Sequence, residues 1–167
     1  MIQMAENGAK LQKGSDKMAD FTPMMGTYTY NLDSKNRIFI PAKHRESLGG
    51  SFVVFPNPKS TQSLIISTVE YLDRLIEKIA TNEEISAEDR SDMIGYISGF
   101  GDTLTTDTQG RVVLAGSLVE YAGLGGPTVI HGCYTHSEIW NATVFRETTR
   151  DKANSLAEAF KKSKIVL

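Results

Sequence analysis

The hydrophobic and polar positions along the chain fall into short stretches with two kinds of spacing. Residues 27–32 (TYTYNL) place an apolar side chain at every second position, which predicts a half-buried strand. Ile38-Phe39-Ile40 predicts a second strand, which ends at Pro41 because proline cannot donate a hydrogen bond to a sheet. A short helix is predicted over 42–48, and Gly49-Gly50 ends it.

The remaining elements follow in the same manner, and the second half of the chain repeats their order. Strands are predicted at 52–55, 64–66, 111–114, 128–130 and 138–140. Helices are predicted at 117–122 and 143–162, and over a segment that carries Val69, Leu72, Ile76 and Ile79 on one face. Ser86-Ala87-Glu88-Asp89 reads as a capping box that opens a further helix, which we expect to end at Gly99.

A repeat at a constant offset of 74 residues organises the chain. Asp33 to Ile40 (DSKNRIFI) aligns with Asp107 to Leu114 (DTQGRVVL), and the flanking strands align at the same offset. We therefore expect one unit at 26–100 and a second at 101–167. About 50 residues of short strands cannot bury much core alone, so the two units are expected to share one core as a pseudo-dimer. Residues 1–25 show neither period and are expected to form a flexible N-terminal extension; the sequence leaves open whether 1–23 are native.

Composition and charge narrow the class of protein. The 167 residues carry a net charge of −2, which argues against a globally basic nucleic-acid binder but not against a local basic patch. The single cysteine, Cys133, excludes an internal disulfide framework and a cysteine-rich zinc module. No apolar run approaches the ~18 residues of a membrane span, and no secretory signal is seen, so we expect a cytoplasmic protein.

The repeated segment has a chemistry that its residue types explain. Asn and Gly enter the left-handed backbone region most readily, so Asn36 and Gly110 predict a tight loop with positive φ. A carboxylate three residues earlier can accept backbone N–H groups of that loop, which assigns this structural role to Asp33 and Asp107. The arginine that follows each turn either pairs with that aspartate, as a folding device, or reaches outward to an anion.

Positive charge gathers in the first unit. Residues 33–48 carry a net charge of +2, whereas 70–92 carry −5 and 102–124 carry −2. We expect Arg37 to contact base edges or phosphate and its basic neighbours to add phosphate contacts, with His44 contributing when protonated. For Arg111, a DNA contact and a role confined to its turn remain open. The candidate DNA-binding residues are Lys35, Arg37, Lys43, Arg45 and Arg111.

The chain resembles the MraZ family of bacterial transcriptional regulators in three strings. These are Gly26 to Arg45 (GTYTYNLDSKNRIFIPAKHR), Gly110 to Leu124 (GRVVLAGSLVEYAGL) and Glu138-Ile139-Trp140, and the likeness covers about residues 24–150. The resemblance implies an α+β fold of two tandem SpoVT-AbrB-type swapped-hairpin units that form a pseudo-dimeric barrel with flanking helices. The family's D-x-x-x-R motif falls on Asp33 and Arg37, and again on Asp107 and Arg111.

The same resemblance implies a function. It indicates a nucleoid-associated, sequence-specific DNA-binding regulator that assembles as a ring-like homo-oligomer on promoter DNA with repeated boxes. The promoter would be that of a cell-division and cell-wall gene cluster that includes its own gene. No cofactor, small-molecule substrate or membrane partner is implied. The sequence departs from the family in having Asn36 where Gly is usual, Ala115 in place of a second proline, and a mainly acidic inter-repeat helix in which Arg90 is the only arginine.

Other classes of function find less support. His131, Cys133 and His136 lie close in sequence, but with no second cluster of ligands we do not expect a metal site. An enzyme is not expected, because no nucleophile–base pair and no phosphate-binding glycine loop occurs at an informative spacing. The alternative we retain is an antitoxin-like oligomeric interaction module, although such a module would normally carry one hairpin unit and a long C-terminal arm.

Overall fold

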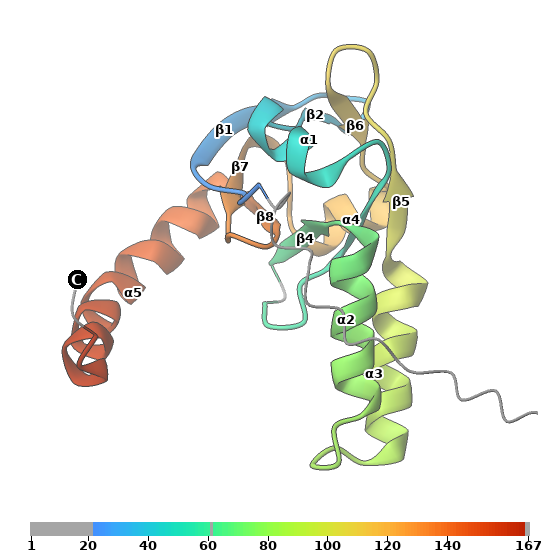
Figure 1. Cartoon of the computed structure of the whole chain (residues 1–167). Helices are drawn as coiled ribbons and strands as arrows, with labels where there is room; N and C mark the ends of the chain where they lie inside the picture. Colours follow the sequence, from blue (N-terminus) through green and yellow to red (C-terminus); the bar gives the residue numbers. More distant parts are fainter. Residues whose placement is uncertain (1–21, 61, 166–167) are drawn as a thin grey trace, which may run out of the picture.

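The computed structural model describes residues 22–60 and 62–165, with Asn154 described only as part of its helix. It contains eight strands and five helices in these ranges, and Figure 1 shows how they are arranged. The strands are β1 (Thr27–Leu32), β2 (Arg37–Phe39), β3 (Phe52–Pro56), β4 (Ser63–Ser67), β5 (Asp102–Leu104), β6 (Arg111–Val113), β7 (Gly126–Gly132) and β8 (Ser137–Asn141). The helices are α1 (Ala42–Leu48), α2 (Val69–Ala80), α3 (Ala87–Phe100), α4 (Gly116–Tyr121) and α5 (Ala142–Ser163).

Six strands form one antiparallel sheet in which the two halves of the chain are interleaved. The strand order is β1-β7-β8-β4-β3-β5. β1 from the first half pairs with β7 from the second, and β5 from the second half pairs with β3 from the first. Strands 74 residues apart therefore take equivalent places at the two edges. The two halves of the chain are therefore joined by backbone hydrogen bonds within one sheet.

The remaining strands, β2 and β6, form a separate two-stranded ribbon. Ile38 stands opposite Val112, and Arg37 stands opposite Val113. Among the described residues the hydrogen-bonded strands form an open sheet and this ribbon, without a closed barrel. The expected α+β class is thus confirmed at the level of mixed strands and helices.

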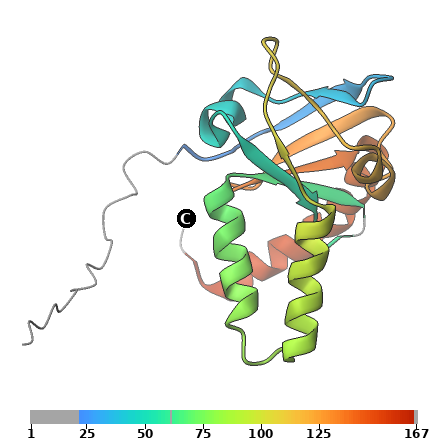
Figure 2. The ribbon, with the colours of Figure 1, turned by 90° about the vertical axis from the view of Figure 1, so that its right-hand side faces the viewer.

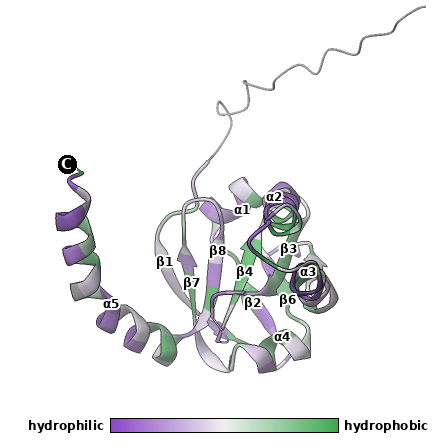
Figure 3. Ribbon diagram, turned by 90° about the horizontal axis from the view of Figure 1, so that it is seen from below, coloured by the Kyte–Doolittle hydropathy of each residue, from purple (hydrophilic) through white to green (hydrophobic). Residues whose placement is uncertain are grey.

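The core fills the space between the ribbon and one face of the six-stranded sheet. Ile38 and Val112 of the ribbon point inward and belong to the same buried cluster as Phe52, Leu64 and Ile139 of the sheet. The opposite face of the sheet packs against α2 and α3 through a second cluster, whose fully or nearly buried members are Val53, Phe55, Ile65, Ile79 and Ile97. β3 and β4 are covered on both faces, so every residue of the two strands is buried and their central positions are apolar without alternation (Figure 3).

Helices α2 and α3 form a hairpin that extends away from the ribbon (Figures 1 and 2). Each begins at a side-chain cap, because Thr68 Oγ1 accepts the N–H of Tyr71 and Ser86 Oγ accepts the N–H of Asp89. The second cap was predicted from the sequence. The predicted end at Gly99 is one residue early, since α3 continues to Phe100 and Gly101 donates its N–H to Ile97 O.

Helix α5 touches the body only near its beginning. Asn141 caps it by accepting the N–H groups of Thr143 and Val144, and the Phe145 ring packs 5.1 Å from that of His131. From Thr149 to Ile165 every side chain that the structure describes is exposed, and the helix stands clear of the sheet (Figures 1 and 3). Across the described helices, none is both long enough and apolar enough to cross a membrane.

Candidate nucleic-acid interface

The loop between β1 and β2 is held by the carboxylate of Asp33. Its Oδ1 accepts the backbone N–H groups of Lys35 and Arg37, both at 2.9 Å. Its Oδ2 accepts a hydrogen bond from Arg37 Nε at 2.6 Å. Asn36 has φ 56°, so the left-handed position lies where the sequence predicted it. One carboxylate therefore fixes both the backbone of the turn and the direction of the arginine that follows.

The loop between β5 and β6 reproduces this geometry. Asp107 Oδ1 accepts the N–H groups of Gln109 and Arg111 at 2.9 Å, and Oδ2 accepts from Arg111 Nε at 2.9 Å. Gly110 takes the left-handed position with φ 82°. In this loop a second nitrogen of the guanidinium, Nη2, also lies 2.8 Å from Asp107 Oδ2.

These contacts stabilise both aspartates in their charged form. The backbone N–H of Arg37 is the largest cause that lowers the pKa of Asp33 below its ordinary 3.8; desolvation opposes it as the second-largest effect, and the Arg37 side chain and the Lys35 N–H lower the pKa further. The N–H and guanidinium of Arg111 lower the pKa of Asp107 in the same way. Both loops therefore carry an ionised aspartate and a paired arginine at neutral pH.

The ribbon joins the two loops by a reciprocal pair of hydrogen bonds. Leu114 donates its N–H to Asn36 O at 2.9 Å, and Ile40 donates its N–H to Gly110 O at 3.0 Å. The carbonyl of each left-handed residue thus accepts from the end of the opposite strand. On the outer side of the ribbon, Phe39 is exposed and its ring lies 5.9 Å below the Arg111 guanidinium carbon.

The predicted basic residues lie in the first loop, at the start of the ribbon strands and in α1, but their side chains differ in exposure. Lys35 and Lys43 are exposed. The Arg37 side chain is 33% exposed and that of Arg111 is 23% exposed. Arg45 in α1 is half-buried against the second loop, where its buried Nε has no hydrogen-bond partner among the described residues.

The expectation that His44 contributes a positive charge is wrong. His44 is fully buried, with Nε2 2.9 Å from Met25 O and Nδ1 2.9 Å from Ser137 Oγ. Desolvation lowers the pKa of its imidazole below 6.5, against the opposing effect of Met25 O, and His131 adds to the lowering. The residue is a hydrogen-bonded core group that links α1 to β8, and the helical spacing that placed it beside Lys43 and Arg45 could not reveal this.

Charge divides the molecule into two ends. Residues 70–92, which cover α2 from its second residue and the beginning of α3, carry a net charge of −5. They lie at the far end from the ribbon and α1 (Figures 1 and 2). The helical hairpin would therefore repel a polyanion, and the basic segment 33–48 at the opposite end would attract it.

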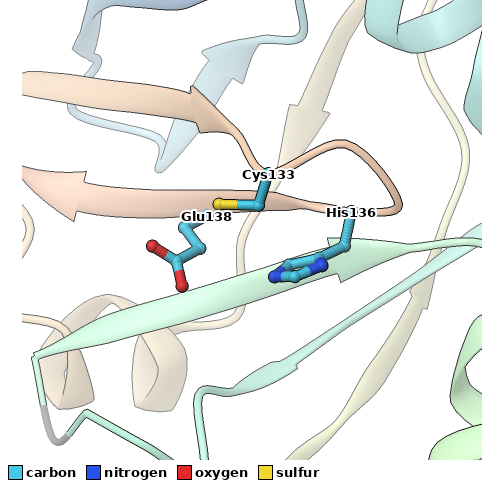
Figure 4. A group of neighbouring side chains, drawn as sticks. All are labelled: Cys133, His136 and Glu138. Atoms are coloured by element: carbon cyan, nitrogen blue, oxygen red, sulfur yellow. The ribbon is translucent and has the colours of Figure 1, made fainter. Parts of the chain in front are cut away.

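The turn between β7 and β8 gathers a second set of polar groups, of which the sequence had suggested only a part. Cys133, His136 and Glu138 offer one sulfur, one ring nitrogen and one carboxylate oxygen within 4.8 Å of one another (Figure 4). Burial, together with the neighbouring Glu138 carboxylate, raises the pKa of the Cys133 thiol to about 12. His131, which the sequence placed beside Cys133, is outside this group, whereas Glu138 was missed because the hairpin turn that brings it close was not considered.

Comparison of the sequence with known proteins identifies the family of this chain. The sequence model of the MraZ protein family, which is described as antitoxin-like, matches residues 24–60 and 101–165. The chain belongs to the MraZ family. Both Asp–Arg loops lie inside the matched ranges, whereas 61–100, which contains α2 and α3, lies between them.

Relatives support the MraZ assignment over most of the chain. Proteins named transcriptional regulator MraZ are 31% identical over 134 residues in Paenarthrobacter aurescens (strain TC1) and 32% identical over 137 residues in Moorella thermoacetica. One from Syntrophomonas wolfei subsp. wolfei is 33% identical over 137 residues. Each alignment covers 80% of this chain, and 92%, 94% and 94% of the respective relative.

Replacement of Gly110 tests the second loop. A Cβ at Gly110 would lie 2.5 Å from Arg45 Nη1 at a φ of +82°, so Gly110→Ala should lower the free energy of unfolding by about 1–2 kcal/mol from backbone strain, with a small further loss because the flexible end of the Arg45 side chain must move aside. Gly123→Ala is the matched control, since Gly123 also has positive φ but nothing lies within 4 Å. Urea unfolding measures both. An equal loss in the two variants, or no coupling between Gly110→Ala and Arg45→Ala, would contradict the contact.

The buried His44 should make the protein less stable in mild acid. Its pKa is lowered in the folded state, so below pH 6.5 the unfolded chain binds a proton that the folded chain does not, and stability falls as the pH falls. His44→Gln should flatten this dependence, even if it lowers stability at neutral pH. The pKa of His136 is lowered by desolvation too, so adding His136→Gln should flatten the curve further. Thermal unfolding as a function of pH provides the measurement, and an unchanged slope in both variants would contradict it.

Proposed function

We propose that this MraZ family member is a sequence-specific DNA-binding transcriptional regulator and not an enzyme. The observation that carries the proposal is the pair of equivalent Asp–Arg loops, joined by the β2–β6 ribbon at the end of the molecule that faces away from the acidic helical hairpin. The relatives' name, transcriptional regulator MraZ, supports the same function.

Arg37 is the residue best arranged to reach a base edge. Among the described residues its side-chain hydrogen bonds go only to Asp33, through Nε. Its two terminal nitrogens are therefore available for the bidentate contact that arginine makes with guanine. Asp33 fixes the guanidinium in advance, which reduces the entropy lost when DNA is bound. The aspartate is a positioning group in this proposal and does not itself contact DNA.

The other basic residues of the first half supply phosphate contacts. Lys35 at the tip of the loop and Lys43 in α1 are exposed on either side of Arg37 in the sequence. Arg45 has a buried Nε and lies against Gly110, so a phosphate contact by Arg45 would be made by its terminal nitrogens beside the second loop. These contacts would raise affinity without selecting a sequence.

Arg111 has a different balance of contacts. It donates from Nε to Asp107, its Nη2 lies 2.8 Å from the same carboxylate, and its guanidinium lies over Phe39. It is also less exposed than Arg37. These contacts favour a role in holding the second loop, while a direct DNA contact by Arg111 stays the weaker of the two proposals.

We also propose the unit boundaries, the fold of each unit and the target DNA that the likeness to the MraZ family implies. We place the unit boundaries at 26–100 and 101–167, preceded by the 1–25 extension, and interpret the interleaved strands as two swapped-hairpin units of a pseudo-dimeric barrel. The partner DNA would be the promoter of a cell-division and cell-wall gene cluster that includes its own gene. The protein would act in the cytoplasm, at the nucleoid.

The basic segment favours binding by several copies at once. Its net charge of +2 at residues 33–48 gives weak attraction to DNA for one chain, so several copies on repeated boxes would bind by avidity.

Two unlike apolar surfaces support assembly into a ring-like homo-oligomer. Leu156 and Phe160 of α5 are 55% and 56% exposed on the part of the helix that stands clear of the body. The second surface is a groove beside α3 whose lining includes Asp92, Met93, Tyr96 and Tyr121. Insertion of α5 from one copy into the groove of the next would make a head-to-tail interface, and such interfaces close into rings when the rotation permits.

The charges of α5 and of the helical hairpin beside the groove are of opposite sign. α5 carries five basic and three acidic residues, with Lys161 and Lys162 in its last turn. The helical hairpin that borders the groove is strongly acidic. Attraction between the two would orient α5 toward the groove and away from the basic segment 33–48 of the neighbouring copy.

The projecting α5 is also the observation that favours the alternative, an antitoxin-like interaction module. A free helical arm with an apolar face could wrap a different protein instead of a second copy. The second Asp–Arg loop argues against this alternative, because a module that only neutralises a toxin needs no duplicated anion-facing loop. Mass measurement and footprinting on the upstream DNA of the gene separate the two.

Replacement of Arg37 tests the DNA interface. Arg37→Ala should weaken binding to the promoter fragment by about 1–3 kcal/mol and relax sequence preference at the contacted base. Lys35→Ala should instead weaken binding to all sequences alike and reduce the salt slope by about one. Lys78→Ala, in the last turn of α2 on the acidic hairpin, is the control and should change neither. The measurement is a fluorescence-anisotropy titration at several salt concentrations; unchanged affinity and slope in Arg37→Ala would refute the assignment.

Replacement of the apolar residues of α5 tests the assembly. The double variant Leu156→Asp, Phe160→Asp places two negative charges against an apolar groove with an acidic border, so the mass in solution should fall toward that of the monomer. Thr149→Asp, which is exposed on the same helix, is the control and should leave the mass unchanged. Light scattering after size exclusion measures both. If the double variant assembles as the wild type does, α5 is not the contact.

A further inference from the structure

The turn between β7 and β8 concentrates three different metal-ligating side chains within six residues. Cys133 directly follows β7, His136 directly precedes β8, and Glu138 is the second residue of β8. Their sulfur, nitrogen and oxygen atoms lie within 4.8 Å of one another, and all three side chains are half-buried. Figure 4 shows the three side chains on the same side of the hairpin, with the imidazole directed toward the carboxylate.

The backbone of the hairpin holds these residues in place. Cys133 donates its N–H to His136 O at 2.8 Å, and Gly132 stands opposite Ser137 in the register of the two strands. The tip of the turn is tied to the segment before β1, because Met24 and Tyr134 exchange N–H to carbonyl hydrogen bonds of 2.8 and 3.0 Å. The positions of Cys133 and His136 are therefore set by the sheet and not by a free loop.

We propose that Cys133, His136 and Glu138 bind one zinc ion, with a water molecule as the fourth ligand. Zinc prefers this mixture of thiolate, imidazole and carboxylate in tetrahedral geometry. Zinc–ligand bonds of about 2.0–2.3 Å would place the ligand atoms roughly 3.5 Å apart. In the structure these atoms lie within 4.8 Å of one another, so they would draw together as the ion binds.

Neighbouring side chains form hydrogen bonds with the proposed ligands, as the groups around a metal site do. Glu138 Oε1 accepts a hydrogen bond from Asn57 Nδ2 at 3.0 Å, and Oε2 accepts one from Trp140 Nε1 at 2.9 Å. Asn57 is 5% exposed and also donates from Nδ2 to Ser63 Oγ at 3.0 Å. Such partners fix the orientation of a ligating carboxylate while each oxygen keeps a lone pair for the ion.

His136 is held in a similar manner. Its Nδ1 lies 3.3 Å from Thr135 Oγ1, and its ring packs 5.0 Å from that of Tyr71 in α2. We assign Nε2 as the ligand atom on this basis. The thiol proton of Cys133 leaves to solvent as the zinc–sulfur bond forms, so the two charged ligands neutralise the ion. Lys59 and His131 are the other charged or titratable groups whose electrostatic effect reaches His136.

A zinc ion here would act on the fold and not on DNA directly. All three ligands belong to the β7–β8 hairpin, while two of the groups that support them, Tyr71 and Asn57, come from α2 and from the segment after β3. Binding would therefore fasten the hairpin to the elements around it and stabilise the folded chain by mass action. The inference is independent of the DNA-binding proposal, because it involves neither Asp–Arg loop.

Cobalt titration of the full chain tests the site. Cys133 is the only cysteine, so a sulfur-to-cobalt charge-transfer band can arise from this residue alone. The band should saturate at one Co²⁺ per chain and disappear when Zn²⁺ is added. Cys133→Ser should abolish it, and His136→Gln or Glu138→Gln should weaken cobalt affinity at least about tenfold. His131→Gln is the matched control on the same hairpin and should bind as the wild type does.

Two results would overturn the proposal. The first is the absence of any band in folded wild-type protein, with circular dichroism as the check of folding. The second is a band of unchanged affinity in both the His136 and Glu138 variants, which would mean adventitious binding to the thiol. If a variant fails to fold, protection of the wild-type thiol from alkylation by added Zn²⁺ decides the question: slower alkylation supports the site, and an unchanged rate contradicts it.

Discussion

The two halves of this chain contribute to one buried core, and the rest of the structure depends on the strand pairing between them. β1 crosses to β7 and β5 crosses to β3, so each half completes the sheet of the other. The β2–β6 ribbon then covers the shared core with Ile38 and Val112. Because the exchange is reciprocal, an interaction formed in one half is supported by residues of the other.

The same exchange creates the candidate DNA interface. Residues 33 and 107 are far apart along the chain, yet antiparallel pairing of β2 with β6 places the two Asp–Arg loops on one ribbon. The hydrogen bonds from Leu114 to Asn36 O and from Ile40 to Gly110 O fasten each loop to the opposite strand. The carboxylates of Asp33 and Asp107 fix the turns and orient the arginines that follow them. The acidic helical hairpin at the other end would repel an anionic partner.

Patterns of local residues were sufficient for most elements and for the chemistry of the turns. The alternation at 27–32, the helix at 42–48, the cap at Ser86 and the left-handed positions of Asn36 and Gly110 all agree with the structure, because each depends on neighbours within a few residues. His44 was misjudged, since its burial depends on Met25 and Ser137, which reach it only through the fold. The proximity of Glu138 to Cys133 and His136 was missed for the same reason.

The sequence by itself determined the turn chemistry and the family, because both are recorded in residue types at fixed spacings. Tertiary structure alone decided which strands pair, which basic residues stay exposed, and that Arg45 lies against Gly110. It also decided that the second half of α5 stands clear of the body. Long-range pairing depends on which buried surfaces fit together, and periodicity along the chain gives only the face that a residue occupies, not the partner that covers it.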